Sequence, residues 1–183
     1  AWGSAFHPHD PLSLHVTSST VQSFSALRYS PLTGAPMGAA IVTGDSADMH
    51  SHKELRWYID MLDGVTVDPA VSIGRQFNGV QAWAEAVWAY RPGNPAGGAF
   101  GDYGFPKLPT LLDDSVAHPV ESPGLPAPWY AVYGNHDTLL LGTFDLSSQL
   151  HALAIGGQKS WSLDATASTI LGGYAATTSA LGR

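Results

Sequence analysis

The sequence contains no cysteine. Disulfides, thiolate metal sites and cysteine nucleophiles are therefore excluded, and any divalent metal must be bound by histidine, carboxylate, amide or water ligands. Basic residues are also few, since 8 Lys and Arg stand against 15 Asp and Glu, for a formal net charge of −7. Such a chain lacks the cationic surface that displaces counterions from a nucleic-acid backbone, so we do not expect nucleic-acid binding.

Long apolar runs are missing as well. No run approaches the roughly 20 residues that cross a bilayer, and no stretch combines a charged start with the apolar middle of a secretory signal. We therefore expect a soluble protein, and an extracytoplasmic location is compatible with this composition. The 183 residues are 44% hydrophobic and 13% charged, which is ordinary globular material with enough apolar side chains for a core.

The spacing of apolar residues predicts short buried strands and amphipathic helices. Strands are expected over residues 38–43 and 129–133, and helices over 12–29, 51–63, 108–117 and 146–155. Ser51 should cap the second of these helices and Gly64 should end it. Each strand is followed by a polar loop and a helical segment, an order that predicts an α/β domain.

Residues 65–106 interrupt this pattern because they are rich in glycine, proline and aromatic side chains. We expect an irregular surface insertion with a short helix around Trp83 and Trp88. The aromatic side chains either pack as a satellite core or form a wall of a substrate pocket. They are Trp83, Trp88, Tyr90, Phe100, Tyr103 and Phe105. Residues 164–183 are mostly Ala, Thr, Ser and Gly, and a weakly ordered tail is expected there.

The first polar loop, Gly44-Asp45-Ser46-Ala47-Asp48, directly follows a predicted strand. Gly44 allows a tight backbone path, and a carboxylate fixed at a strand end, such as that of Asp45, can bind two cations through its two oxygens. Asp48 is placed to bond the loop or cap the next helix. A strand-end turn with a capping aspartate is the simpler interpretation of this loop taken alone.

The second polar loop, Gly134-Asn135-His136-Asp137, also follows a predicted strand. The amide oxygen of Asn135 is a hard, neutral metal ligand, and His136 can donate a proton or bind metal. Asp137 can orient the imidazole and favour its charged form. A polar turn is again the alternative. We expect both strands to be neighbours in one buried sheet, with oxygens of Asp45 and Asn135 close enough to share a cation.

In this order the two loops resemble the second and third sequence blocks of the calcineurin-like metallophosphoesterase superfamily. Surrounding stretches, among them residues 54–60, 62–64, 103–106 and 128–132, resemble an actinobacterial family of these enzymes. The resemblance covers about residues 1–156. It implies a β-sandwich flanked by helices, and a single, partial metallophosphoesterase domain over residues 1–183. It also implies two divalent ions (Mn, Fe, Zn or Mg) that activate water to hydrolyse a small phosphate ester.

The resemblance also implies residue roles. Asp45 would bridge the two metals, Asn135 would bind the second, and His136 would act on the phosphate or the leaving group. Asp137 would then orient His136. The supporting residues would be Gly44, Asp48 and Gly134.

The superfamily's Asp-x-His and Gly-His-x-His blocks are absent from this sequence. We therefore expect the chain to be an internal piece of a longer enzyme and to be inactive alone. The alternatives are a short protein that has lost its chemistry and an aromatic-rich binding module. His151 is the candidate for one further metal ligand, and His50 and His52 lie close enough to the first loop to approach the site.

Overall fold

The computed structural model describes residues 10–48, 50–77, 81, 92–93, 103–143 and 145–156. The chain divides into two compact units. One comprises Leu12–Ser72 and His118–Lys159, and the other comprises Ala1–Pro11, Ile73–Ala117 and Ser160–Arg183. Both polar loops belong to the first unit, which therefore positions the candidate site.

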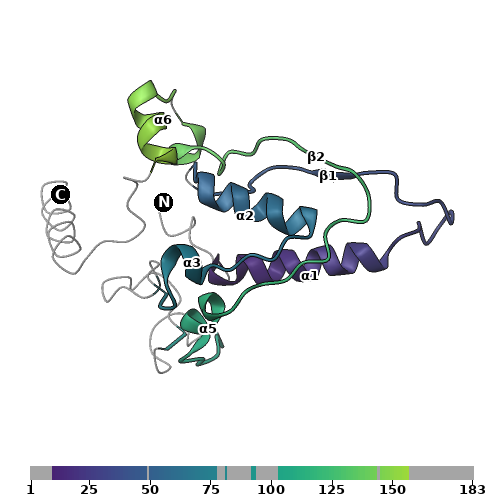
Figure 1. Ribbon diagram of the computed structural model, residues 1–183, viewed down its shortest axis with the longest axis horizontal. Coiled ribbons are helices and arrows are strands. Elements are labelled where there is room, and N and C mark those ends of the chain that lie inside the picture. Colours follow the sequence, from purple (N-terminus) through teal and green to yellow (C-terminus); the bar gives the residue numbers. More distant parts are fainter. Residues whose placement is uncertain are drawn as a thin grey trace, which may run out of the picture. The chain divides into compact units, whose positions relative to one another are not determined.

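The described chain combines helices with two short strands (Figure 1), and the strands and helices predicted over 12–29, 38–43, 51–63, 108–117, 129–133 and 146–155 are each present within their predicted runs. The longer elements are α1 (Ser13–Ala26), β1 (Ala40–Val42), α2 (His52–Asp63), α5 (Leu111–Ala117), β2 (Trp129–Ala131) and α6 (Ser148–Ile155). Shorter helical turns are η2 (Asp10–Leu12), α3 (Ala70–Ile73) and η4 (Leu139–Gly142). The α/β class is confirmed.

The ends of α2 follow its local sequence. The hydroxyl of Ser51 accepts the backbone N–H of Glu54 at 3.3 Å, which satisfies a donor that the first turn leaves without an intrahelical partner. Gly64 ends the helix with a φ of 81°, a left-handed conformation that costs a residue without a Cβ little. Both predicted ends of this helix are confirmed.

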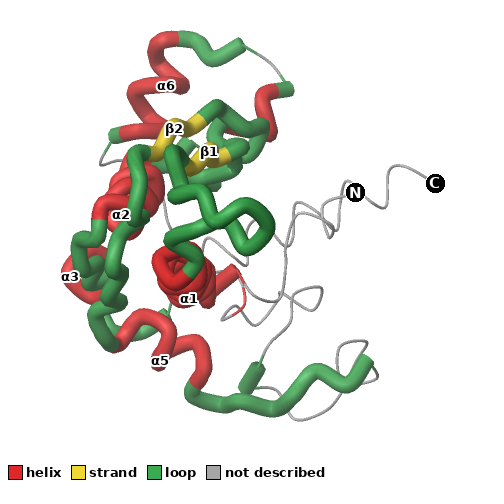
Figure 2. The backbone as a smooth tube through the Cα atoms, turned by 90° about the vertical axis from the view of Figure 1, so that its right-hand side faces the viewer, coloured by secondary structure: helices red, strands yellow, loops and turns green. Residues whose placement is uncertain are grey.

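Strands β1 and β2 pair in parallel, so the prediction that they are neighbours is confirmed. Their register sets Ala40, Ile41 and Val42 opposite Trp129, Tyr130 and Ala131. Helices α1 and α2 lie on the same side of this pair, as Figures 1 and 2 show from two directions. The loops that leave the carboxyl ends of the two strands therefore emerge at one edge of the sheet.

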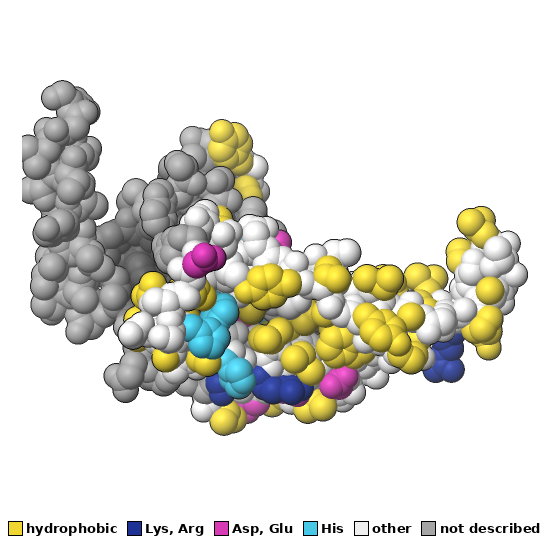
Figure 3. Space-filling model, turned by 90° about the horizontal axis from the view of Figure 1, so that it is seen from above, with side chains coloured by type: hydrophobic (Ala, Val, Ile, Leu, Met, Phe, Trp, Pro, Cys, Tyr) yellow, Lys and Arg dark blue, Asp and Glu magenta, His cyan; other side chains and the backbone are white. Residues whose placement is uncertain are grey.

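The prediction that this sheet is buried is wrong. Ile41 is 74% exposed, Tyr130 65% and Val132 59%. Hydrophobic side chains spread over the face of the molecule seen in Figure 3. Apolar runs of this kind are typical of strands covered on both faces, whereas α1 and α2 both lie on one side of this pair. The described residues form a single two-stranded sheet, and the β-sandwich stays a prediction.

The core of the motif-bearing unit lies beside α2. Met61 is fully buried against Val67 and Val120, and Leu14 and Trp57 pack around them. Val67 and Val120 exchange backbone hydrogen bonds of 3.0 and 2.7 Å. Full burial of a side chain such as Met61 contributes about 1.5–3 kcal/mol. The core therefore holds the chain that leaves α2 against the chain that enters β2.

The other unit is described over fewer residues. A side-chain oxygen of Asp113, in α5, accepts the N–H of Phe77 at 2.9 Å, and the guanidinium of Arg75 donates to the carbonyl of Ala117. Tyr103 is 79% exposed and is therefore not part of a packed satellite core. Most of the predicted insertion over 65–106, including the helix around Trp83, lies outside the described residues, as does the predicted tail over 164–183.

Within the described parts of the chain, no helix combines the length and the apolar character that crossing a bilayer requires.

Candidate functional site

The two polar loops meet backbone to backbone at the edge of the sheet. The N–H of Val132 donates to the carbonyl of Val42 at 3.0 Å, which extends the strand pairing to the loops. A Cβ added to Gly44, whose φ is 99°, would lie 2.5 Å from the backbone nitrogen of Gly134. Gly44 is therefore required both by its left-handed backbone and by this close approach. The signal for it was present in both sequence motifs.

The carboxylate of Asp137 holds the two loops together. Its Oδ2 accepts the N–H groups of Gly134 at 2.8 Å and Asp45 at 3.0 Å. Its Oδ1 accepts those of Ser46 and Ala47, each at 2.8 Å. Successive backbone N–H groups of this kind form a concave anion-binding site, and here the anion is a side chain of the same protein. Asp137 therefore determines the conformation of the first loop from the second.

Asp48, rather than Asp137, lies against the His136 ring, which corrects the predicted orienting role of Asp137. Both oxygens of Asp137 accept backbone N–H groups, whereas Nδ1 of His136 lies 3.2 Å from Oδ1 of Asp48. The Asp48 side chain is 65% exposed and that of His136 32%, so the pair contributes little to stability but fixes the ring's direction. Asp48 does not cap α2, because Ser51 does.

Asp45 is fixed by its own backbone and by the second loop. Its φ is 56°, a left-handed conformation that aspartate adopts more readily than most residues. Its Oδ1 accepts the N–H of His136 at 2.9 Å, which fixes the carboxylate against the second loop. Asp45 and Asn135 are both exposed to solvent. The structure thus brings the two predicted metal ligands to the same pair of loops.

The donor types at this edge suit divalent ions, but their number is small. Asp45 offers a carboxylate oxygen and Asn135 an amide oxygen, which Mg²⁺, Mn²⁺ and related ions accept. Within the described ranges, no group of three or more His, Asp and Glu side chains could hold a metal ion. The described residues therefore fit part of a metal site and do not complete one.

Two histidines meet beside the second loop, a contact that spacing in the sequence did not predict. Nε2 of His50 lies 3.0 Å from Nδ1 of His151, which extends from α6. Nδ1 of His50 lies 3.2 Å from the backbone carbonyl oxygen of Asp137. Of the two histidines near the first loop, His50 thus reaches the second loop, whereas His52 is exposed at the start of α2. His151, the candidate further ligand, contacts His50.

Tyr58 was not identified from the sequence as a residue of the site, although it lies on the helix that follows the first loop. Its phenol hydrogen-bonds the side chain of Ser46. Burial raises the pKa of Tyr58 above its ordinary value of 10.0, and the nearby charge of Asp137 raises it further, while the bond to Ser46 acts in the opposite direction. The inward face of α2 was the signal that could have identified it.

We expect the raised pKa of Tyr58 to make the protein less stable at alkaline pH. The unfolded chain ionises this phenol at its ordinary pKa of 10.0, below the folded value, so the free energy of unfolding should fall as pH rises above 10.0. Tyr58→Phe should lose this part of the slope, and Tyr130→Phe, at a 65% exposed position, should keep it. Urea unfolding from about pH 8 to 11 measures the difference. Equal slopes in both variants would contradict the expectation.

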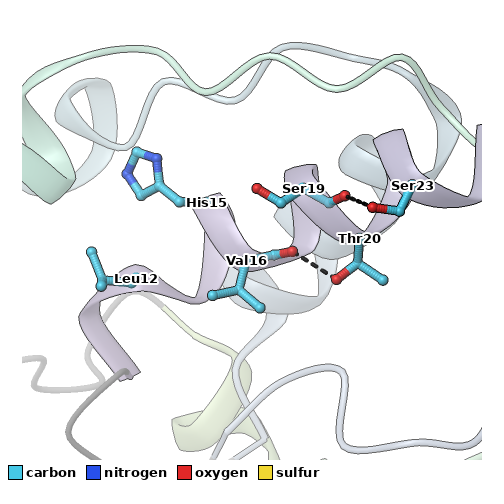
Figure 4. A pocket seen from close by; sticks show the side chains of 6 residues that line it. All are labelled: Leu12, His15, Val16, Ser19, Thr20 and Ser23. Carbon is cyan, nitrogen blue, oxygen red and sulfur yellow. Dashed lines mark hydrogen bonds between the residues drawn. The ribbon is translucent and has the colours of Figure 1, made fainter.

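A cavity of about 470 Å³ lies between α1 and β1 and reaches Thr43, Gly44 and Tyr58 at the start of the first loop. A more open hollow of about 330 Å³ lies on α1 itself (Figure 4). In this hollow the hydroxyls of Thr20 and Ser23 donate to helix carbonyls at 2.8 and 2.9 Å. The cavity beside the loops is therefore the better candidate for a substrate-facing space.

Comparison with known proteins identifies no relative of this chain. No protein-family model, no curated protein and no solved structure gives a significant match.

Proposed function

We propose that the two loops are part of the active site of a metal-dependent phosphoric ester hydrolase. The observation that carries the proposal is the reciprocal bonding of the loops. Asp137 accepts four N–H groups, three of them from the first loop, while Asp45 accepts the N–H of His136 from the second at 2.9 Å. Two loops fixed in this way present a carboxylate, an amide and an imidazole at one edge of a sheet. Sites in open α/β sheets concentrate at such edges.

Each side chain then has a defined part. Asp45 and Asn135 supply oxygen ligands, and His136 faces the reacting phosphate, where it stabilises charge or protonates the leaving oxygen. Asp48 holds the His136 ring through Nδ1, which leaves Nε2 for the substrate. Asp137 positions the first loop and touches no substrate. When bound, two divalent ions would supply electrostatic stabilisation and an ionised water near neutral pH.

Because no Asp-x-His block of the superfamily precedes the first loop and no Gly-His-x-His block follows the second, we propose that further ligands come from segments outside these 183 residues. Such segments would also pair with the outer edges of β1 and β2, with which no other described strand pairs, and cover the exposed face that carries Ile41 and Tyr130. On this proposal the sheet seen here is one part of a β-sandwich, and the substrate is a small phosphate ester.

The test begins with the complete reading frame that contains this sequence. With Mn²⁺, it should hydrolyse an aryl phosphate ester at more than about 1 s⁻¹. Asp45→Ala should reduce metal content and hydrolysis together, because it removes a ligand. Asp114→Ala, an exposed aspartate of α5, should change neither. A complete protein whose hydrolysis needs no metal, or is unaffected by Asp45→Ala, would contradict the proposal.

The 183-residue chain assayed alone should remain below this rate, because a single bridging carboxylate does not hold a divalent ion against water. Metal-dependent turnover above about 1 s⁻¹ by the isolated chain would contradict the need for outside ligands. It would also make His50, His52 and His151 the first residues to substitute.

A further inference from the structure

The contact between His50 and His151 joins two segments that are far apart in the sequence. His50 follows the first loop, and His151 lies on α6, which packs near α2. Their ring centroids are 5.0 Å apart, with Nε2 of His50 3.0 Å from Nδ1 of His151. His50 is half-buried and His151 exposed, so the nitrogens are accessible from solvent. Histidine side chains gather on the face seen in Figure 3.

A hydrogen bond at the other ring nitrogen of His50 leaves its Nε2 available as a ligand. Nδ1 of His50 donates its proton to the carbonyl oxygen of Asp137 at 3.2 Å, since a carbonyl can only accept. Neutral His50 then has its lone pair on Nε2, which accepts the Nδ1–H of His151 at 3.0 Å. For one ion to bind both nitrogens, His151 must carry its proton on Nε2 instead, which leaves the Nδ1 lone pair for the ion. A histidine that donates its other nitrogen to a backbone carbonyl is the usual arrangement at metal sites, because the bond fixes both tautomer and ring direction.

The spacing of the two nitrogens allows both to bind one ion. With metal–nitrogen bonds of about 2.0–2.1 Å, nitrogens 3.0 Å apart subtend about 95° at a shared ion. Among divalent first-row ions, the affinity of imidazole donors rises toward Ni²⁺ and Cu²⁺. An angle near 90° is that of octahedral or square-planar coordination, which Ni²⁺ and Cu²⁺ adopt with imidazole ligands.

The backbone of His50 is also unusual. Its φ is 60°, in the left-handed region that residues with a Cβ rarely adopt. The contacts of the ring with Asp137 and His151 accompany this conformation, and it directs the imidazole toward α6. Unfavourable backbone conformations of this kind concentrate at ligand-binding sites.

We propose that His50 and His151 form a two-imidazole site for a late first-row transition-metal ion, Ni²⁺ or Cu²⁺. Water completes the coordination sphere. This site goes beyond the proposed hydrolase function and is independent of Asp45 and Asn135, because it uses nitrogen rather than oxygen donors. Bound metal would tie α6 to the loops that follow both strands.

The experiment titrates the 183-residue chain with Ni²⁺ alone and follows histidine imidazole signals by ¹⁵N NMR. The signals of His50 and His151 should broaden together, before those of the other histidines. His50→Asn, which removes the imidazole but tolerates a left-handed backbone, and His151→Ala, which suits a helix, should each weaken Ni²⁺ binding at least about tenfold. His52→Ala should change it less than about twofold.

The proposal is tested by the order in which histidine signals broaden and by the Ni²⁺ affinity of the variants. Broadening of all histidine signals in parallel, or unchanged affinity in both His50→Asn and His151→Ala, would overturn the proposal. If circular dichroism shows that one variant is unfolded, the other variant supplies the comparison. Asp45→Ala should leave Ni²⁺ binding unchanged. A loss of Ni²⁺ binding in Asp45→Ala would assign the ion to the hydrolase site instead and would also overturn the proposal.

Discussion

His136→Ala in the complete reading frame should lower turnover of a phosphate ester by about 10²–10⁴-fold, the usual contribution of a positioned acid–base group. The same variant should keep its metal content. The backbone and the ring of His136 have separate roles. Its backbone N–H donates to Oδ1 of Asp45 at 2.9 Å, whereas its ring contacts Asp48. Alanine removes the ring and retains the backbone bond, so the metal ligand stays in place while the proton donor is lost.

The measurements are turnover with saturating Mn²⁺ and bound metal by elemental analysis. Asp48→Asn is the matched control, because it keeps a side-chain oxygen near Nδ1 of His136 but removes the charge, and its effect should be smaller than that of His136→Ala. Unchanged turnover in His136→Ala would exclude the ring from catalysis. A parallel loss of metal and turnover would identify His136 as a ligand instead.

What the sequence predicted correctly was local. Helix α2 begins and ends where the sequence indicates. The signals are the cap at Ser51, the glycine at Gly64 and the apolar spacing between them, and each is recognised from a few neighbouring residues. The two strand-end loops were identified in the same way, since each follows a short apolar run. Local propensities suffice for such features because the groups that satisfy a helix end belong to the same segment.

What the sequence did not predict depends on partners distant along the chain. Asp137 lies beside His136 in the sequence, and adjacency suggested that the two interact. The carboxylate instead accepts N–H groups 90 to 92 residues away. Asp48 takes the place beside the His136 ring across 88 residues. Likewise, an apolar strand shows that a covering surface is expected but not which segment provides it. The sequence therefore did not show what covers the face of Ile41 and Tyr130, which is exposed here.

Asp137→Ala should destabilise the folded chain by about 2–4 kcal/mol, a large part of the stability of a small domain. Each hydrogen bond to a charged acceptor contributes about 1.5–3 kcal/mol. The four bonds of Asp137 do not add fully, because they share one carboxylate and water reaches the loop in the variant. The loss should appear in urea unfolding as a lower midpoint with little change in slope.

Asp137→Asn distinguishes a requirement for the carboxylate from a requirement for side-chain size. Each carboxylate oxygen accepts two N–H groups, so an amide must place its NH₂ donor against two other donors, whichever way it is turned. Asparagine should therefore recover little of the lost stability, although it is nearly isosteric. Asp48→Ala is the control, because that side chain is 65% exposed and contacts one imidazole, and it should cost no more than about 1 kcal/mol. An asparagine variant within about 0.5 kcal/mol of the parent would show that the loops hold together without the charge, and that Asp137 is not what fixes Asp45 at the site.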